Sequence, residues 1–246
     1  MLELDRIYNM DCLEGIKQLS DKSIDLVIID PPYSSGTRQT ANRSAGQIPK
    51  RGEKWNTAGI IWDSSFSSFG LSQFLNIFYR EVKMKMKEHA HIYTFIDWRQ
   101  YPLLTLSIES SGLFINNLIV WDKGMYTLGG NYRSQYELIV FGSNGTPREL
   151  NTTTTGNVLK FKRVSNGEHP TEKPIDLVKA LIMFASNENE LVFDGFIGGG
   201  TTAIACKQSN RRFIGFEINP DYCKIAEKRL KNVPEKLESF IDMKEG

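Results

Sequence analysis

The sequence predicts an α/β fold built on a twisted, mostly parallel β-sheet with helices on both faces. Short apolar runs alternate with amphipathic stretches along the chain, as strand–helix–strand units do. The apolar run 24–29 ends in Asp30-Pro31-Pro32-Tyr33, and because two prolines cannot continue a sheet, the strand must end there. A second apolar run, 191–194, leads into a glycine-rich turn and a helical pattern, which is typical of nucleotide-binding units.

The individual elements follow from this alternation in chain order. Strands are expected near residues 6–9, 24–29, 91–96, 117–121, 136–141, 190–194 and 212–217, and helices near 12–19, 70–87, 100–111, 174–186, 201–209 and 220–231. Asp11 suits the N-cap of the first helix, and Pro174 suits the first turn of the helix near 174–186. A glycine-rich loop joins strands 117–121 and 136–141, which favours an antiparallel hairpin at one edge of the sheet.

Length and composition limit the class of protein. A chain of 246 residues can bury a substantial core, and we expect residues 1–246 to form a single catalytic domain. Apolar residues make up 40%, charged residues 24%, and the net charge is +1, so any basic patch must be local. Three cysteines without metal-type spacing indicate a reduced intracellular protein and no metal. The absence of a signal peptide or membrane-length apolar run predicts a cytoplasmic protein without a membrane partner.

Two long polar segments interrupt the alternation of strands and helices. Residues 34–62 carry five basic residues against the single acid Glu53, a net charge of +4 directly after the proline motif. Residues 142–173 are rich in Gly, Asn and Thr. Loops this long inside a compact domain are usually functional or disordered, and a plain surface insertion is the alternative for both. We expect a function for the first, whose basic residues are Arg38, Arg43, Lys50, Arg51 and Lys54.

The glycine-rich turn has the features of an adenosine-binding site. Glycines let the backbone approach a ligand, and Glu217 ends the next expected strand 19 residues after Gly198. A carboxylate there can accept hydrogen bonds from ribose hydroxyls. A glycine cluster alone also fits a helix-packing turn, and even with the acid it does not separate NAD from S-adenosylmethionine. Asp194, which can hold an ammonium group, and Phe196 favour a cationic ligand over a pyrophosphate.

The Asp30–Tyr33 motif suits the activation of an amine on a nucleic-acid base. The lone pair of such an amine is delocalised into the ring, and two acceptors on its N–H groups favour a more tetrahedral nitrogen. The Asp30 carboxylate and the Pro31 carbonyl can be these acceptors, and Tyr33 can stack on the base for about 1–3 kcal/mol. No metal or covalent intermediate is needed, because positioning and electrostatics carry the rate. A simple turn is the alternative reading, and the glycine-rich turn in the same chain argues against it.

Taken together, these motifs resemble the β-class amino-group DNA methyltransferases, the adenine-N6 and cytosine-N4 enzymes of the DPPY type that use S-adenosylmethionine. The resemblance covers most of the chain, and the order of its segments is specific. It implies a Rossmann-like S-adenosylmethionine-dependent methyltransferase fold and a reaction on a base flipped out of the duplex. The similar segments are Asn9–Glu14, Asp30–Tyr33, His91–Phe95, Leu118–Lys123, Gln135–Phe141, His169–Pro174 and Arg212–Glu217.

The resemblance also implies roles for individual residues. The motif at Asp30, Pro31, Pro32 and Tyr33 would hold and activate the target amine. Asp30 would also contact the cofactor, as the corresponding aspartate does in several relatives. His169 fits a loop brace as well as a cofactor contact. The expected cofactor contacts are Asp11 and Cys12 at the adenine end, Glu217 at the ribose, His169, Thr171 and Lys173 at the methionine end, and Asp194, Phe196, Gly198, Gly200 and Thr201 in the turn.

Two departures from the family pattern affect the expected binding properties. Gly195 and Gly199 stand where the family usually has a proline and a serine, which predicts a more flexible turn and weaker cofactor binding. The stretch between Phe141 and His169 is shorter than in many relatives. Recognition of DNA is therefore expected from the 34–62, 122–134 and 142–173 loops or from a second subunit. The second loop offers Lys123, Tyr126, Tyr132 and Arg133 as DNA contacts, with ordinary loop packing as the alternative for the two tyrosines.

Adenine N6 is the expected target, because an aspartate at the first motif position usually accompanies it in this family. Cytosine N4 presents the same amine geometry and stays open as an alternative. An RNA or protein amine methyltransferase and a catalytically silent DNA-binding subunit are further alternatives. The expected partner is double-stranded DNA, while a homodimer, a cognate restriction endonuclease and a bacterial, plasmid or phage origin are left open.

Overall fold

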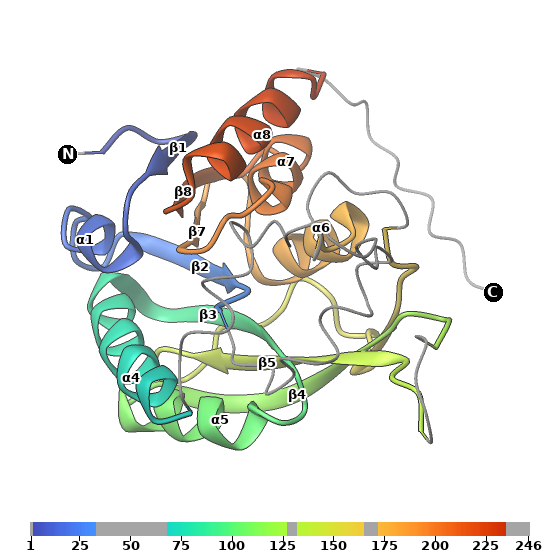
Figure 1. Ribbon diagram of the computed structural model, residues 1–246. Coiled ribbons are helices and arrows are strands. Elements are labelled where there is room, and N and C mark those ends of the chain that lie inside the picture. Colours follow the sequence, from blue (N-terminus) through green and yellow to red (C-terminus); the bar gives the residue numbers. More distant parts are fainter. Residues whose placement is uncertain (1, 33–67, 127–131, 165–171, 235–246) are drawn as a thin grey trace, which may run out of the picture.

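The computed structural model describes residues 2–32, 68–126, 132–164 and 172–234 (Figure 1). Within these ranges the strands form one sheet in the order β1-β8-β7-β2-β3-β5-β4-β6. The strands are β1 (Arg6–Asn9), β2 (Ile24–Ile29), β3 (Met86–Ile96), β4 (Phe114–Asp122), β5 (Tyr136–Ser143), β6 (Val158–Lys160), β7 (Leu191–Asp194) and β8 (Arg212–Glu217). The helices are α1 (Cys12–Ile16), α4 (Ser68–Lys85), α5 (Tyr101–Ser110), α6 (Ile175–Ala185), α7 (Thr201–Gln208) and α8 (Pro220–Lys231).

Helices cover both faces of the sheet and bury two apolar cores (Figure 1). One core lies between the sheet and α1, α4 and α5, and the other lies between the sheet and α6, α7 and α8. Consecutive residues of β2 alternate between them: Val27 and Ile29 belong to the first core, and Leu26 and Ile28 to the second. Because both faces of β2 are buried, its sequence is a continuous apolar run instead of an alternating one.

The strand directions bring several strand ends to one edge, which we call the carboxyl edge. β1, β8, β7, β2 and β3 are mutually parallel where they pair. β5 runs antiparallel to both β3 and β4, with Ile96 opposite Leu138 and Asp122 opposite Tyr136. The last residues of β2, β3 and β4 therefore share the carboxyl edge with the first residues of β5.

Most predicted elements are confirmed, and the differences have physical reasons. β3 starts at Met86 instead of 91, because the pairing with β2 shifts register after Ile24 and a polar stretch forms an irregular start with His89 at φ 68°. β6 was not predicted, since three residues carry almost no pattern. It pairs parallel with β4, so the predicted antiparallel hairpin exists but is not the outermost part of the sheet.

The predicted start of the first helix is confirmed by its cap. The Asp11 carboxylate accepts hydrogen bonds from the backbone N–H groups of Leu13 at 2.8 Å and Glu14 at 3.3 Å. Pro174 stands one residue earlier than expected, as the N-cap of α6. In the part of the chain that the structure describes, no helix combines the length and apolarity needed to cross a membrane.

Candidate active site

The candidate site lies where the strand order of the sheet reverses. From β2 the chain continues through α4 to β3 on one side, and from β7 it continues through α7 to β8 on the other. β2 and β7 are neighbours, with Leu26 opposite Val192 and Val27 opposite Phe193. Open α/β sheets bind ligands outside the carboxyl ends of the strands at such a reversal. Asp30 follows β2 and the glycine-rich turn follows β7, so both lie at this point (Figure 1).

Asp194 fastens the start of the glycine-rich turn. Its side chain is buried, and its two oxygens accept hydrogen bonds from the backbone N–H of Phe196 at 2.9 Å and the hydroxyl of Thr202 at 2.6 Å. Burial raises the pKa of Asp194 to about 7; these two hydrogen bonds oppose the rise, and the nearby charges of Asp30 and Glu217 add to it. Both carboxylate oxygens of Asp194 thus accept hydrogen bonds from the turn and from the first turn of α7.

Glu217 ties the end of β8 to the same turn. Its Oε2 accepts a hydrogen bond from the Gly198 backbone N–H at 3.0 Å, and its Oε1 accepts one from Asn219 N–H at 2.7 Å. Burial raises the pKa of the Glu217 carboxyl, and these backbone hydrogen bonds partly offset the rise. The Ile218 backbone N–H adds a third hydrogen bond, and because a carboxylate has about four acceptor positions, acceptor capacity remains for a ligand.

The glycines of the turn meet specific steric demands. Gly200 has φ 83°, in the left-handed region, and a Cβ added there would lie 2.8 Å from Cβ of Ala226 in α8. A Cβ at Gly195 would lie 3.0 Å from the Phe78 ring, and the Phe196 ring packs 4.9 Å from that same ring. The turn is therefore packed closely between α4 and α8. Its predicted greater flexibility stays a prediction.

A chain of alternating charges surrounds Asp30. Lys173 Nζ lies 2.7 Å from Asp30 Oδ2 and 2.7 Å from Glu137 Oε1, and Lys123 Nζ lies 2.9 Å from Glu137 Oε2. The side chains of Lys173 and Glu137 are only 9% and 10% exposed. The Lys173 ammonium also lies 5.1 Å from the centre of the Phe95 ring. Charged residues from four separate segments, together with Phe95 of β3, thus meet near the end of β2.

The charges in this chain stabilise one another against the cost of burial. Burial opposes the charge on Lys173, but Asp30 and Glu137 hold the pKa of its ammonium above its usual range. Burial likewise opposes the charge on Glu137, but Lys173 and Lys123 hold the pKa of that carboxyl below its usual range. Lys173 therefore stays protonated, which suits a fixed cation and not a general base.

The remaining predicted cofactor residues occupy the same edge with different surroundings. Cys12 is buried, and burial together with the Asp11 charge raises the pKa of its thiol to about 12. Asp11 points its carboxylate at the first turn of α1, and Thr201 begins α7 and is buried. Pro31 is buried behind Asp30, and Pro32 is half-buried.

The predicted DNA-contact residues divide into three groups. Tyr126, Tyr132 and Arg133 are exposed beside the carboxyl edge, with the Arg133 guanidinium 5.0 Å from the Tyr126 ring centre. Lys123 instead turns its ammonium to Glu137 and lies 4.8 Å from the centre of the Trp121 ring. The other predicted site residues lie outside the described residues: Tyr33, Arg38, Arg43, Lys50, Arg51, Lys54, His169 and Thr171.

Several residues at this edge were missed by the sequence reasoning. Glu137 lies in the similar segment Gln135–Phe141, but no role was predicted for it. Glu172 and Arg229 form a buried ion pair that no motif indicated. Trp98, 57% exposed, follows the end of β3, with the Arg99 guanidinium 5.1 Å from its ring centre. An exposed tryptophan directly after a buried strand was the available signal for this pair.

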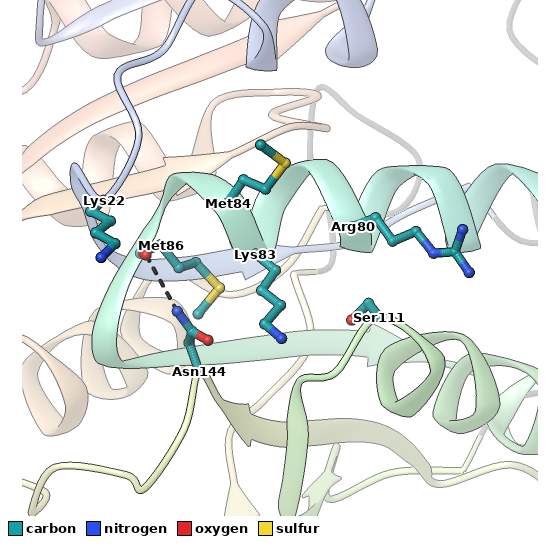
Figure 2. Close-up of a pocket in the computed structure, with 7 residues that line it drawn as sticks. All are labelled: Lys22, Arg80, Lys83, Met84, Met86, Ser111 and Asn144. Atoms are coloured by element: carbon teal, nitrogen blue, oxygen red, sulfur yellow. Dashed lines mark hydrogen bonds between the residues drawn. The ribbon is translucent and has the colours of Figure 1, made fainter.

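A basic hollow lies away from this site, near the start of β3. It has a volume of about 440 Å³ and contains the start of β3 at Met86, where the Asn144 side-chain amide donates a hydrogen bond to the Met86 carbonyl at 3.3 Å (Figure 2). None of the predicted site residues lines it. The full lining consists of Lys22, Arg80, Lys83, Met84, Met86, Ser111 and Asn144.

The electrostatics of the strand-reversal site suit a positively charged ligand. Asp194 and Glu217 end β7 and β8, and Asp30 directly follows the neighbouring strand β2; the charges of Asp30 and Glu217 both act on Asp194. Among the described residues, no group of three or more His, Cys, Asp or Glu is arranged to hold a metal ion. An amine donor placed beside Asp30 would lie at the junction of the acidic turn and the charge chain.

Comparisons with known proteins agree with this geometry. A family model described as DNA methylase, covering N6 and N4 methyltransferases, matches residues 24–228. The chain is 28% identical over 271 residues to the Type II methyltransferase M1.MboII of Moraxella bovis, covering 90% of this chain and 95% of that protein. It is 29% identical over 256 residues to the DNA adenine methyltransferase YhdJ of Escherichia coli, covering 93% and 83%.

Solved structures show the same fold. A complex of M1.HpyAVI with S-adenosylmethionine aligns with a TM-score of 0.68 at 23% identity, covering 92% of this chain and 99% of that chain. The cytosine-N4-specific PvuII DNA methyltransferase aligns with a TM-score of 0.72 at 17% identity, covering 94% and 88%. The predicted α/β methyltransferase fold is thereby confirmed.

Proposed function

The chain belongs to the N6/N4 DNA methylase family, and from this premise we propose that it transfers a methyl group from S-adenosylmethionine to the N6 amine of an adenine flipped out of duplex DNA. One observation carries the proposal: Asp30 directly follows β2 at the strand reversal, and the glycine-rich turn follows the neighbouring strand β7. This arrangement sets an acceptor for an amine next to a turn suited to the methyl donor.

The turn fits the sulfonium cofactor, which supplies the methyl group when bound. Glu217 keeps acceptor capacity beyond its bonds to the backbone N–H groups of Gly198, Ile218 and Asn219, and a carboxylate at the end of this strand suits a ribose hydroxyl. The acidic edge formed with Asp30 and Asp194 favours a cation. The predicted contacts of Asp11, Cys12, Phe196 and Thr201 with the cofactor belong to this proposal.

Asp30 would act on the target amine. Its carboxylate accepts one N–H of the amine and the Pro31 carbonyl accepts the other, which directs the nitrogen lone pair away from the base ring. The buried Pro31 and the half-buried Pro32 hold this backbone in place, and Tyr33 would stack on the base. Lys173 keeps the carboxylate turned to one side by its contact with Oδ2.

DNA would approach the carboxyl edge. The exposed Tyr126, Tyr132 and Arg133 lie there and would contact the displaced strand or the phosphates, together with the basic residues of the 34–62 segment. The exposed pair Trp98 and Arg99 extends this surface. A homodimer and a partner endonuclease remain predictions.

Cytosine N4 is the second candidate target, because the exocyclic amine of cytosine offers Asp30 the same two N–H groups. Among the proteins similar to this chain, YhdJ is named a DNA adenine methyltransferase and the PvuII enzyme is cytosine-N4-specific. Adenine is preferred on the aspartate at the first position of the motif.

The test is a direct identification of the methylated base. The purified protein is incubated with S-adenosylmethionine and unmethylated bacterial DNA, and the DNA is digested to nucleosides for mass spectrometry. We expect N6-methyldeoxyadenosine with the wild type and a loss of at least about 100-fold with Asp30→Ala, which removes one acceptor and should leave the fold intact by circular dichroism. N4-methyldeoxycytidine would keep the mechanism and change the base. Neither product, despite measured cofactor binding, would refute a DNA substrate.

A further inference from the structure

Two adjacent residues connect the two sides of the site. Glu172 pairs with Arg229 of α8, and Arg229 Nη1 donates a second hydrogen bond, at 2.5 Å, to the carbonyl of Gly199 in the glycine-rich turn. Lys173 reaches the other way, to Asp30 and Glu137. We call these two residues the Glu172–Lys173 link, because one end is bonded to the cofactor side and the other end to the target side.

Both ends of the link are buried ion pairs, which makes their geometry fixed. The side chain of Glu172 is 7% exposed and that of Lys173 is 9% exposed. A buried charge that loses its partner is strongly unfavourable, so neither end can leave its partner without a large cost. Links of this kind are better attested as devices for orientation than as sources of stability.

Glu137 acts on Asp30 through Lys173. Its two carboxylate oxygens pair with Lys173 and Lys123, and Lys173 in turn pairs with Asp30, the proposed acceptor of the amine. With Glu137 present, Lys173 divides its single positive charge between two carboxylates. Without it, the whole charge would act on Asp30 and weaken that carboxylate as an acceptor for an N–H group.

We propose that Glu137 and Arg229 are positioning residues for methyl transfer, an inference that rests on the proposed function. Glu137 holds Lys173 so that the Asp30 carboxylate keeps its orientation and its strength as an acceptor. Arg229 bridges the Glu172 carboxylate and the Gly199 carbonyl, so that the turn keeps its place relative to Asp30. Replacing Glu137 should therefore affect mainly kcat, and replacing Arg229 should affect mainly the KM for S-adenosylmethionine.

The test compares three folded variants in steady-state kinetics. Glu137→Gln should lower kcat by about 10-fold or more with an unchanged KM for S-adenosylmethionine, as loss of a supporting residue does. Arg229→Gln should raise that KM by about 10-fold, because the turn loses its bond at the Gly199 carbonyl and is less well ordered for the cofactor, with a smaller change in kcat. The matched control is Glu190→Gln, which removes the ion pair with Arg148 at 2.7 Å near the start of β7 and should change only the unfolding temperature.

A second readout is independent of methyl transfer. Lysine amines are labelled with an amine-reactive reagent in the native protein, and the modified peptides are quantified by mass spectrometry. Lys173 should be protected in the wild type and in Glu190→Gln and labelled several-fold faster in Glu137→Gln. A wild-type kcat in folded Glu137→Gln, or unchanged protection of Lys173, would overturn the inference for Glu137. An unchanged KM in Arg229→Gln would overturn it for Arg229.

If the wild-type protein methylates no DNA, the proposed function fails while the labelling still decides whether Glu137 holds Lys173. If the wild type is active and Glu137→Gln behaves as Glu190→Gln does, the inference fails and the proposed function stands. The two failures are therefore distinguishable.

Discussion

The two sides of the site are constructed in different ways. The cofactor side, from Asp194 to Asn219, is held by carboxylates that accept hydrogen bonds from nearby backbone N–H groups. The target side is held by charged side chains from four segments, and the bond from Lys173 to Asp30 joins residues 143 positions apart. A local turn can be recognised from a motif, whereas a set of distant ion pairs exists only once the sheet has formed.

The difference has energetic consequences that mutations can measure. The cofactor side depends on backbone conformation, so its weak points are glycines and single acceptors. The target side depends on mutual compensation of buried charges, so removing one charge leaves others without a partner. The following variants test this distinction, beginning with the largest expected effect.

Lys173→Met should be the most damaging change. It leaves Asp30 and Glu137 without the cation between them, and removing one member of a buried ion pair typically costs about 3–5 kcal/mol. Chemical denaturation should show this loss, and methyl transfer should fall at least as far as in Glu137→Gln. A free energy of unfolding within about 1 kcal/mol of the wild-type value would mean that the ion pairs of Lys173 contribute no more than exposed ion pairs do.

Gly200→Ala should be next, and it should act through the backbone. A non-glycine residue in the left-handed region costs about 1–3 kcal/mol, and the added Cβ would approach Ala226 to 2.8 Å. Gly195→Ala is the matched control, because its backbone is not left-handed and its Cβ would meet the rings of Phe78 at 3.0 Å and Phe193 at 3.4 Å. Equal unfolding free energies for both variants would contradict the assigned role of the left-handed turn.

Glu217→Ala should chiefly weaken cofactor binding. The loss of charge-assisted hydrogen bonds of about 1.5–3 kcal/mol corresponds to a rise of about 10- to 100-fold in the KM for S-adenosylmethionine, with kcat less affected. Asp221→Ala, an exposed change in the first turn of α8, serves as the control and should leave the KM unaltered. An unchanged cofactor requirement in Glu217→Ala would show that the ribose lies elsewhere.

Asp194→Asn should act mainly on the pH dependence of stability. The folded pKa of Asp194 is raised from 3.8 to about 7, so the folded protein keeps a proton that the unfolded chain releases. This group therefore lowers stability as the pH rises from about 4 to about 7. Unfolding temperatures should be measured from pH 4 to 8. The unfolding temperature of the variant should rise relative to that of the wild type as the pH increases from about 4 to about 7. Parallel curves would argue against a raised pKa of Asp194.

The sequence predicted the fold well where the environment of an element was uniform. β2 and β8 were placed at their observed ends, because continuous apolar runs bounded by special residues leave little choice of boundary. β3 was placed too short because Lys87, Glu88 and His89 are polar and belong to an irregular edge that alternation does not describe. β6 was missed because its pairing with β4, and not its own three residues, defines it.

The candidate site shows the same limit. Asp30, Asp194 and Glu217 could be found because each follows an apolar strand and stands next to a turn residue. Lys173 was expected near the cofactor, but its contact with Asp30 and Glu137 depends on β5 running antiparallel to β3, which brings Glu137 to the carboxyl edge. Lys123 was expected to contact DNA because the sequence around it does not show that it pairs with Glu137.

The neighbouring position of β2 and β7 has a consequence for synthesis of the protein. Leu26 of β2 pairs with Val192 of β7. More than half of the chain must therefore be synthesised after β2 before its partner strand emerges from the ribosome. Pairings this distant in sequence form slowly and late in folding. We therefore expect a nascent chain to remain inactive until β7 and β8 have left the exit tunnel. Under this ordering, a ribosome-bound fragment that ends before β7 lacks the cofactor side of the site.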